Sequence, residues 1–242
     1  MNEYVTDEYG VPVLRAPDIE QKAEQVIKHF RPALLESPCH IPLLEFIEEL
    51  HEKYGVQRSY HLDLGESPKG RKILGRTRLK PLDIAIDQSL KNDPRFPFAL
   101  AHELGHLVFH RRIDLAKTGY ANQEISDTEL DMLTGKKILK TPRDWIEWHA
   151  NYFAAALLMP RATFHEAVAS AQHELGITHN VGCILLNNKG YSQVDYIKTN
   201  RILQQIYGVN QTNVEYRLSE LGILIDHRDE DVSHISELFK TE

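Results

Sequence analysis

The spacing of apolar positions predicts helices in the first part of the chain and a change to strands after it. Apolar residues recur every three or four positions over residues 18–30, and Pro32 then ends this helix. A second helix is predicted from Pro42 to Gly55, because proline is tolerated in the first turn and glycine is favoured after the last. Over residues 60–64 apolar and polar residues alternate instead, which indicates extended structure.

The middle and the C-terminal part of the chain predict strands followed by helices. Two strand candidates, Lys72–Leu79 and Leu82–Ile86, are separated by Lys80-Pro81, and a third covers Cys183–Leu186. The predicted helices of this part are Pro97–Arg111, Thr141–Met159, Arg161–Leu175, Thr199–Tyr207 and Gln211–Leu221. This order predicts an α+β fold that is mostly helical, with a small antiparallel or mixed sheet packed beside the helix Pro97–Arg111.

Residues 112–141 are polar and predict a long loop. Ser126 and Glu129 have the spacing of a helix-capping pair, so one short helix is predicted within this loop. Loops of this length are often functional, and this one is a candidate lid or inhibitory segment.

Composition and charge exclude several classes of protein. The 242 residues are 42% hydrophobic and 26% charged, which is typical of a globular protein with a substantial core. Twenty-eight basic residues against 35 acidic ones give a net charge of −7, opposite to that expected for wrapping nucleic acid or binding an anionic membrane. Cys39 and Cys183 lie far apart, which argues against a disulfide framework and against a cysteine-ligated zinc ribbon.

No part of the sequence predicts export or membrane insertion. The first residues are acidic, and no signal-like apolar stretch follows them. The longest apolar run, Phe153–Met159, is far shorter than the roughly 20 residues that span a bilayer. We therefore expect a cytoplasmic protein.

The segment His102-Glu103-Leu104-Gly105-His106 carries the candidate chemistry. Its two histidines lie one helical turn apart, so both imidazoles can bind one metal ion, and Glu103 beside them can take a proton from water. H-E-x-x-H occurs by chance about 0.06 times in a chain of this composition, so its context matters. The surrounding residues are apolar and predict a buried helix. Gly105 costs this helix about 1 kcal/mol relative to alanine, which predicts the close approach of another element there.

A catalytic zinc ion usually has three protein ligands and one open position. The metzincin pattern fails, because Phe109 stands where glycine is required and Arg112 where the third histidine is required. Glu147 is the better candidate, because it lies in an apolar helix where an isolated carboxylate would need a cationic partner. Asn151 follows one turn later and is expected to orient a ligating histidine.

His110 lies on the same helix face as His102 but about 12 Å along the axis. It cannot share the ion with His102, and we expect it to contact a ligand or to interact with the helix C-terminus. His149 is two residues from Glu147, about 200° around the helix. We therefore expect Glu147, and not His149, to face the metal.

Two segments together resemble the ImmA/IrrE family of zinc metallopeptidases. They are Ala99–His110, which reads ALAHELGHLVFH, and Glu147–Pro160, which contains E-x-x-A-N-x-F-A-A-A-L-L-M-P. The resemblance covers roughly residues 20–225. It implies one zinc ion bound by His102, His106 and Glu147, with Glu103 as the general base. The chain departs from the family at His149, where an acidic or amide residue is common.

The resemblance also implies the fold and the substrate. Members are similar to the thermolysin-like gluzincins in their core, and characterised ones cleave a helix-turn-helix repressor of a bacterial or mobile-element regulon. We accordingly expect four parts in this chain, with no prediction of its oligomeric state. These are an extended arm (1–17), a zincin-like metallopeptidase domain (18–176), a helix-turn-helix-like subdomain (177–225) and an acidic tail (226–242).

In the implied mechanism, Glu103 takes a proton from water as that water attacks a peptide carbonyl, and passes it to the leaving amine. The group that stabilises the oxyanion stays open among four candidates, Tyr120, Tyr152, His149 and His165. The strand Leu82–Ile86 is a candidate sheet edge that would receive the substrate as an added strand, with an ordinary core strand as the alternative.

Two other functions compete with proteolysis. Helices 199–207 and 211–221, joined by residues 208–210, resemble a helix-turn-helix, so a DNA-binding protein is the main alternative. The second of these helices carries two acids and one base, and residues 226–231 add four acids to one arginine. Direct DNA binding is therefore not expected. The other alternative is a protein that sequesters a regulator without cutting it, with zinc in a structural role.

Overall fold

The computed structural model describes residues 4–118, 120, 124–132 and 139–228. The helices are α1 (Ala16–Phe30), α2 (Leu43–Tyr54), α3 (Phe96–His110), α4 (Glu129–Met132), α5 (Pro142–Leu158), α6 (Arg161–Glu174), α7 (Gly190–Tyr207) and α8 (Gln211–Glu220). The strands are β1 (Gln57–Leu62), β2 (Ile73–Leu79), β3 (Leu82–Asp87), β4 (Glu124–Thr128), β5 (Ile184–Leu186) and β6 (Leu224–Asp226). The prediction of a mostly helical α+β fold with a small mixed sheet is confirmed.

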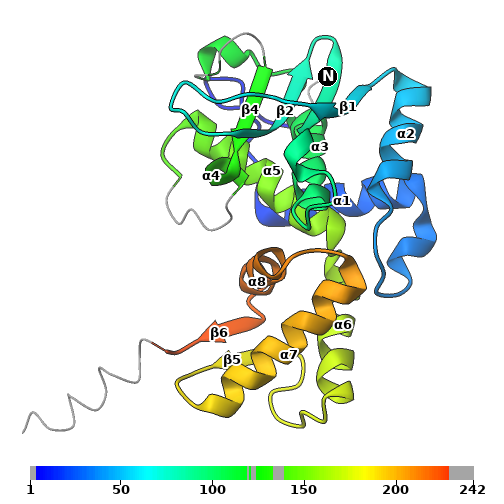
Figure 1. Cartoon of the computed structure of the whole chain (residues 1–242), viewed down its shortest axis with the longest axis vertical. Helices are drawn as coiled ribbons and strands as arrows, with labels where there is room; N and C mark the ends of the chain where they lie inside the picture. Colours follow the sequence, from blue (N-terminus) through cyan, green and yellow to red (C-terminus); the bar gives the residue numbers. More distant parts are fainter. Residues whose placement is uncertain (1–3, 119, 121–123, 133–138, 229–242) are drawn as a thin grey trace, which may run out of the picture.

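The larger sheet lies beside α3 and α5 in the upper part of Figure 1, whereas α6, α7 and α8 lie in the lower part with the two-stranded sheet β5-β6. The strand order of the larger sheet is β1-β3-β2-β4. β1 pairs with β3 in parallel, and β2 pairs antiparallel with both β3 and β4. β3 is thus hydrogen-bonded on both sides, so the prediction that Leu82–Ile86 forms an open edge is wrong. Its central residues 84–86 are fully buried, as in an ordinary core strand.

The prediction of a loop over residues 112–141 missed β4. The short helix predicted there exists as α4, but Ser126 lies inside the strand and does not cap it. Thr128 directly precedes α4, and both its backbone N–H and its hydroxyl donate to Oδ2 of Asp131, at 2.9 and 2.8 Å. β4 is the edge strand of the sheet beyond β2.

Helix α3 packs between the sheet and α5. A Cβ on Gly105 would lie 3.0 Å from Cα of Ala150 on α5, so the predicted close approach at this glycine is confirmed. The start of α5 is fixed by a capping pair, because Thr141 accepts from the backbone N–H of Asp144 and the Asp144 carboxylate accepts from Thr141. These two helices hold most of the candidate site.

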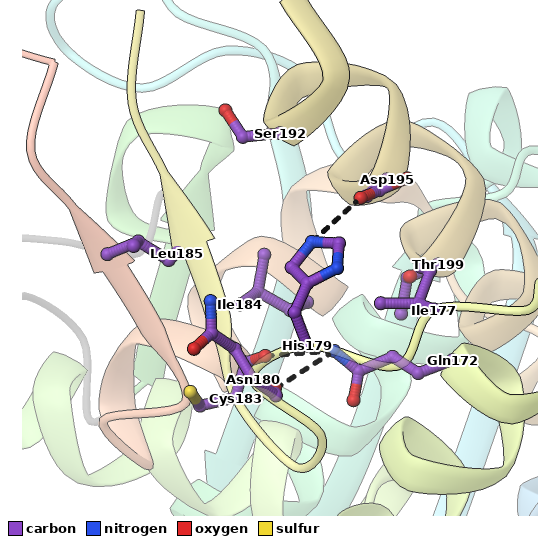
Figure 2. A pocket seen from close by; sticks show the side chains of 10 residues that line it. All are labelled: Gln172, Ile177, His179, Asn180, Cys183, Ile184, Leu185, Ser192, Asp195 and Thr199. Carbon is purple, nitrogen blue, oxygen red and sulfur yellow. Dashed lines mark hydrogen bonds and ion pairs between the residues drawn. The ribbon is translucent and has the colours of Figure 1, made fainter. Parts of the chain in front are cut away.

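The lower part of the molecule contains the two helices of the helix-turn-helix-like segment. α7 begins at Gly190 and not at Thr199, and α8 is followed by the unpredicted strand β6. The loop before β5 is held by Gln172, whose amide donates to the carbonyl of Cys183 at 2.8 Å (Figure 2). The remainder of the predicted acidic tail, from residue 229, lies outside the described residues. Within the described ranges, no helix is long and apolar enough to cross a membrane.

Candidate metal centre

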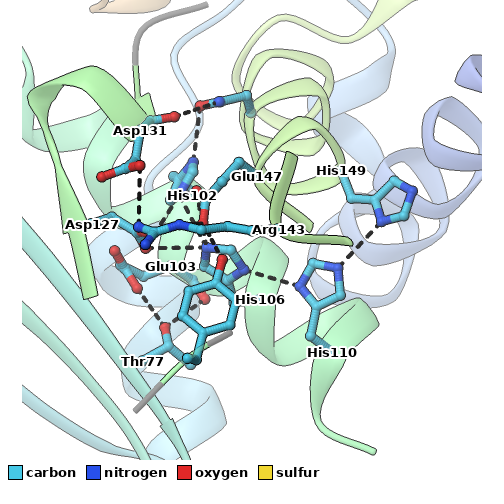
Figure 3. A network of polar contacts seen from close by, with 12 residues as sticks. Thr77, His102, Glu103, His106, His110, Asp127, Asp131, Arg143, Glu147 and His149 are labelled. Carbon is cyan, nitrogen blue, oxygen red and sulfur yellow. Dashed lines mark hydrogen bonds and ion pairs between the residues drawn. The ribbon is translucent and has the colours of Figure 1, made fainter. Parts of the chain in front are cut away.

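Three elements bring four possible metal ligands together. His102 and His106 come from α3, Glu147 from α5 and Asp127 from β4, and one ligand atom of each lies within 4.8 Å of all the others (Figure 3). All four side chains are buried. Three of them are the ligands expected from the sequence, and Asp127 was not expected.

The spacing of these atoms suits a tetrahedral ion. The two Nε2 atoms of His102 and His106 are 3.0 Å apart. Oδ2 of Asp127 lies 3.5 and 3.2 Å from them, and Oε2 of Glu147 lies 3.4 and 4.0 Å from them. Tetrahedral zinc with bonds of about 2.0–2.1 Å would separate neighbouring ligand atoms by about 3.3–3.4 Å. The donor set and its spacing therefore fit zinc.

Polar neighbours orient both histidines. Nδ1 of His102 lies 2.9 Å from Oδ1 of Asn151, so an N–H at Nδ1 leaves the lone pair of Nε2 directed into the cluster. The amide nitrogen of Asn151 donates to the carbonyl of Asp131 at 2.8 Å, which fixes the amide orientation. Nδ1 of His106 lies 2.9 Å from Nδ1 of His110. Asn151 and His110 thus each contact one of the two histidines of the cluster.

Glu147 is held by one carboxylate oxygen and presents the other to the cluster. Oε1 accepts a hydrogen bond from the hydroxyl of Tyr120, and Nε of Arg143 lies 4.0 Å from it. Oε2 makes no hydrogen bond with any residue that the structure describes. An orphaned buried carboxylate oxygen is costly, and a metal ion would satisfy it.

Glu103 lies beside the cluster and is oriented by the sheet. The hydroxyl of Thr77 on β2 lies 2.6 Å from Oε2 of Glu103, whereas Oε1 finds no hydrogen-bond partner among the described residues. A Cβ on Gly75 would lie only 2.0 Å from Oε1, so only glycine leaves room for this carboxylate.

Burial and neighbouring charges shift the pKa values of the site without a metal. Burial raises the pKa of Glu103 well above its usual value, and the Asp127 charge raises it further. Burial would also raise the pKa of Asp127, but the two imidazoles outweigh it and hold this pKa well below the usual range. For His102, burial lowers the pKa, and the Asp127 and Glu147 carboxylates more than reverse the effect. The cluster is therefore built to pair negative carboxylates with positive charge.

Of the four candidates for oxyanion stabilisation, Tyr120 is the one that contacts the cluster. Tyr152 donates to Glu20 at 2.9 Å, away from the metal ligands. His149 lies behind His110, with its Nδ1 3.3 Å from His110 Nε2 (Figure 3). His165 is exposed and bonds the carbonyl of Arg161.

Sequence reasoning missed Gly75, Thr77 and Asp127. Gly75 offered a signal, because glycine inside a strand often marks a close approach. Asp127 offered a weaker one: in the segment Glu124-Ile-Ser-Asp-Thr it shares the inward parity of Ile125, where an apolar residue is expected.

The family model of the IrrE N-terminal-like domain, Peptidase_M78, matches residues 60–219, more than half of the chain. The chain belongs to this family. The match spans β2, α3, β4 and α5, so it includes every element of the metal cluster. Membership of the IrrE-like family supports a metallopeptidase-like role for the cluster.

Comparison with solved structures adds a fold relationship. A Mycobacterium tuberculosis transcriptional regulator matches with a TM-score of 0.50 and 17% sequence identity, over 84% of this chain and 55% of the regulator. At this identity the likeness shows the fold alone, and our IrrE-like chain spans only about half the length of that protein. A search of curated proteins found no match.

Proposed function

We propose that the chain is a zinc-dependent metalloendopeptidase, with His102, His106 and Glu147 as metal ligands and Glu103 as the general base. One observation carries the proposal. Buried ligand atoms from α3, α5 and β4 lie within 4.8 Å of one another, and Glu103, which follows His102 on α3, has an Oε1 without a hydrogen-bond partner among the described residues. Such a concentration of buried charge is stable only with a partner of opposite charge.

Zinc bound there would lower the pKa of a water molecule and polarise a peptide carbonyl. Glu103 accepts the proton of that water through Oε1 and delivers it to the leaving amine. Thr77 keeps the other oxygen, Oε2, in place during both transfers. The raised pKa of Glu103, caused by burial and by Asp127, makes this carboxyl a better proton acceptor than an exposed one.

Tyr120 is the proposed donor to the oxyanion. Its hydroxyl contacts Glu147, and the Arg143 guanidinium lies over its ring at 5.0 Å. Burial and then the Glu147 charge raise the pKa of Tyr120, so its hydroxyl stays protonated and can donate at neutral pH.

The proposed substrate is a helix-turn-helix repressor, as the family resemblance implies, and we propose no direct contact with DNA. The one arginine of α8, Arg217, is fully buried and forms a two-pronged ion pair with Glu20 at 2.6 and 2.8 Å. The exposed side chains of α8 include Glu215 and Glu220 and no base. A helix with this charge is poorly suited to bind in a DNA groove.

Cleavage of a purified helix-turn-helix repressor tests the proposal. The purified chain should cut it in the presence of zinc. Glu103→Gln should retain zinc but lose cleavage by a factor of at least about 100, whereas Glu52→Gln, at an exposed site on α2, should cut normally. If Glu103→Gln relieves repression as well as the unmodified chain does, the protein sequesters its target and does not hydrolyse it.

A further inference from the structure

Strand β4 covers the candidate metal centre from the solvent side. Glu103, His102, His106 and Asp127 are each fully buried, so a peptide cannot reach them in this arrangement. A hollow beside the site is lined by Glu124, Ser126 and Thr128 of β4 and by Tyr120 and Arg143, which lie against Glu147, but by none of the cluster residues. β4, together with Tyr120 and Arg143, therefore stands between this hollow and the metal ligands.

Asp127 is the residue that ties β4 to the cluster. Both of its carboxylate oxygens are buried, and neither forms a hydrogen bond in the part of the chain that the structure describes. Its polar contacts are with the cluster histidines, at 3.2 and 3.5 Å from their Nε2 atoms. A buried carboxylate in such a position needs a cation, and the ion of the proposed site would supply it.

The number of protein ligands determines whether the zinc ion can activate water. His102, His106 and Glu147 leave one position of a tetrahedral zinc ion free, as a hydrolytic site requires. Asp127 is the fourth donor within the same 4.8 Å cluster and would fill that position. A closed set of four protein ligands is typical of a zinc ion that does not activate water.

The position of β4 also blocks the neighbouring sheet edge. In the register of the two strands, Asp127 pairs with Gly75, the residue that makes room for Glu103. An extended peptide that reached Glu103 along β2 would need the backbone groups that β4 now occupies. β4 thus occupies two places that a substrate would need. Its Asp127 fills the fourth coordination position of the ion, and its backbone pairs with the edge of β2.

We infer that Asp127 is a fourth metal ligand that closes the metal site at rest, and that β4 must leave β2 each time a peptide substrate enters. This inference rests on the proposed function, since it assumes that the cluster binds the catalytic ion. β4 is suited to leave, because it is short and, within the described part of the chain, has a neighbouring strand on one side only. Its ion pair between Glu124 and Arg78 is partly exposed and contributes little.

Cobalt substitution tests the inference without any substrate. Co(II) in the site gives an absorption spectrum that reports ligand number, and acetohydroxamate binds the ion only where a coordination position is open. We expect the unmodified Co(II) protein to be unresponsive to acetohydroxamate at concentrations that change the spectra of Asp127→Ala and Asp127→Asn. Glu124→Gln, an outward-facing carboxylate on the same strand, is the matched control and should behave like the unmodified chain.

Zinc affinity, measured by competition with a chelator, gives a second readout. Loss of a partner that only orients a ligand lowers metal affinity about 10–100-fold, so loss of a direct ligand in Asp127→Asn should lower it by at least about tenfold. Equal zinc affinity and equal acetohydroxamate binding in the unmodified chain and Asp127→Asn would overturn the inference and leave the three-ligand site intact. A chain that takes up no metal would overturn the proposed function as well. Circular dichroism of both variants checks that they are folded.

Discussion

The hydroxyl of Thr77 lies 2.6 Å from Oε2 of Glu103, which links the sheet directly to the proposed base on α3. Thr77 is fully buried, and its hydroxyl also lies 3.1 Å from the backbone carbonyl of Glu103. The orientation of Glu103 therefore depends on β2 as well as on its own helix. Oε1 is left free for a proton, which is the arrangement that a general base requires.

Replacing Thr77 with valine should shift the pH dependence of proteolysis. Burial and Asp127 raise the pKa of Glu103, and the Thr77 hydrogen bond lowers it. A hydrogen bond to a charged group contributes about 1.5–3 kcal/mol, so its loss should raise the pKa of Glu103. The acidic limb of kcat/KM against pH should therefore move to higher pH. Thr77→Ser keeps the hydroxyl and should restore the original profile; an unshifted profile in Thr77→Val would show that the contact does not act on the base.

Replacing Gly75 with alanine should disable the base without removing the metal. The new Cβ would lie 2.0 Å from Oε1 of Glu103, so the carboxylate has to move. A displacement of about 1 Å at a reacting group can lower a rate about 100-fold, and we expect kcat to fall by at least that factor while zinc content is unchanged. Gly190→Ala is the control, since a Cβ there meets no atom within 4 Å. Full activity in Gly75→Ala would contradict the assigned position of Glu103.

The sequence best predicted those parts of the site whose structure depends on local patterns and helical spacing. Such patterns predict the end of α2 at Gly55, the H-E-x-x-H helix and the apolar helix that carries Glu147. β4 could not be predicted in this way, because its five residues gain their position from pairing with β2 and from the cluster at Asp127. The burial of an aspartate in a strand is decided by its partners on α3, 21 and 25 positions away in the chain, and no local propensity encodes those partners.

Acid should destabilise the metal-free protein through His149. Burial, and then the neighbouring His106, lower the pKa of His149 to about 3. The unfolded chain binds a proton at this residue below a pH of about 6.5, whereas the folded chain does not bind it until about pH 3. The contribution of His149 to the free energy of unfolding is therefore fully present above pH 6.5. It decreases toward pH 3, by about 1.4 kcal/mol per pH unit.

His149→Gln should remove this part of the dependence of the free energy of unfolding on pH. Urea unfolding of the metal-free chain between pH 6 and 4 would measure it, as the difference in slope between the variant and the unmodified chain. Using the difference cancels the other titrating groups, which include Glu103 with its raised pKa and hence the opposite dependence. Equal slopes would mean that His149 is protonated in the folded chain.

The buried ion pair between Glu20 and Arg217 should contribute strongly to stability. It joins α1 to α8, and Nε of Arg217 also donates to the carbonyl of Met159 at 2.9 Å. Arg217→Leu would leave the Glu20 carboxylate buried without its cation, which costs about 3–5 kcal/mol. Chemical denaturation should show this loss, whereas Arg15→Ala, in an exposed pair with Asp18, should leave the unfolding midpoint unchanged. A small effect of Arg217→Leu would mean that solvent reaches Glu20.

The proposed function requires that His102, His106 and Glu147 bind one catalytic zinc ion. The most direct measurement is the metal content of the purified protein by elemental mass spectrometry, for the unmodified chain and for His106→Ala. We predict about one zinc ion per unmodified chain and loss of that ion in His106→Ala, with both proteins folded. An unmodified chain that contains no metal and takes up no added zinc would contradict the account.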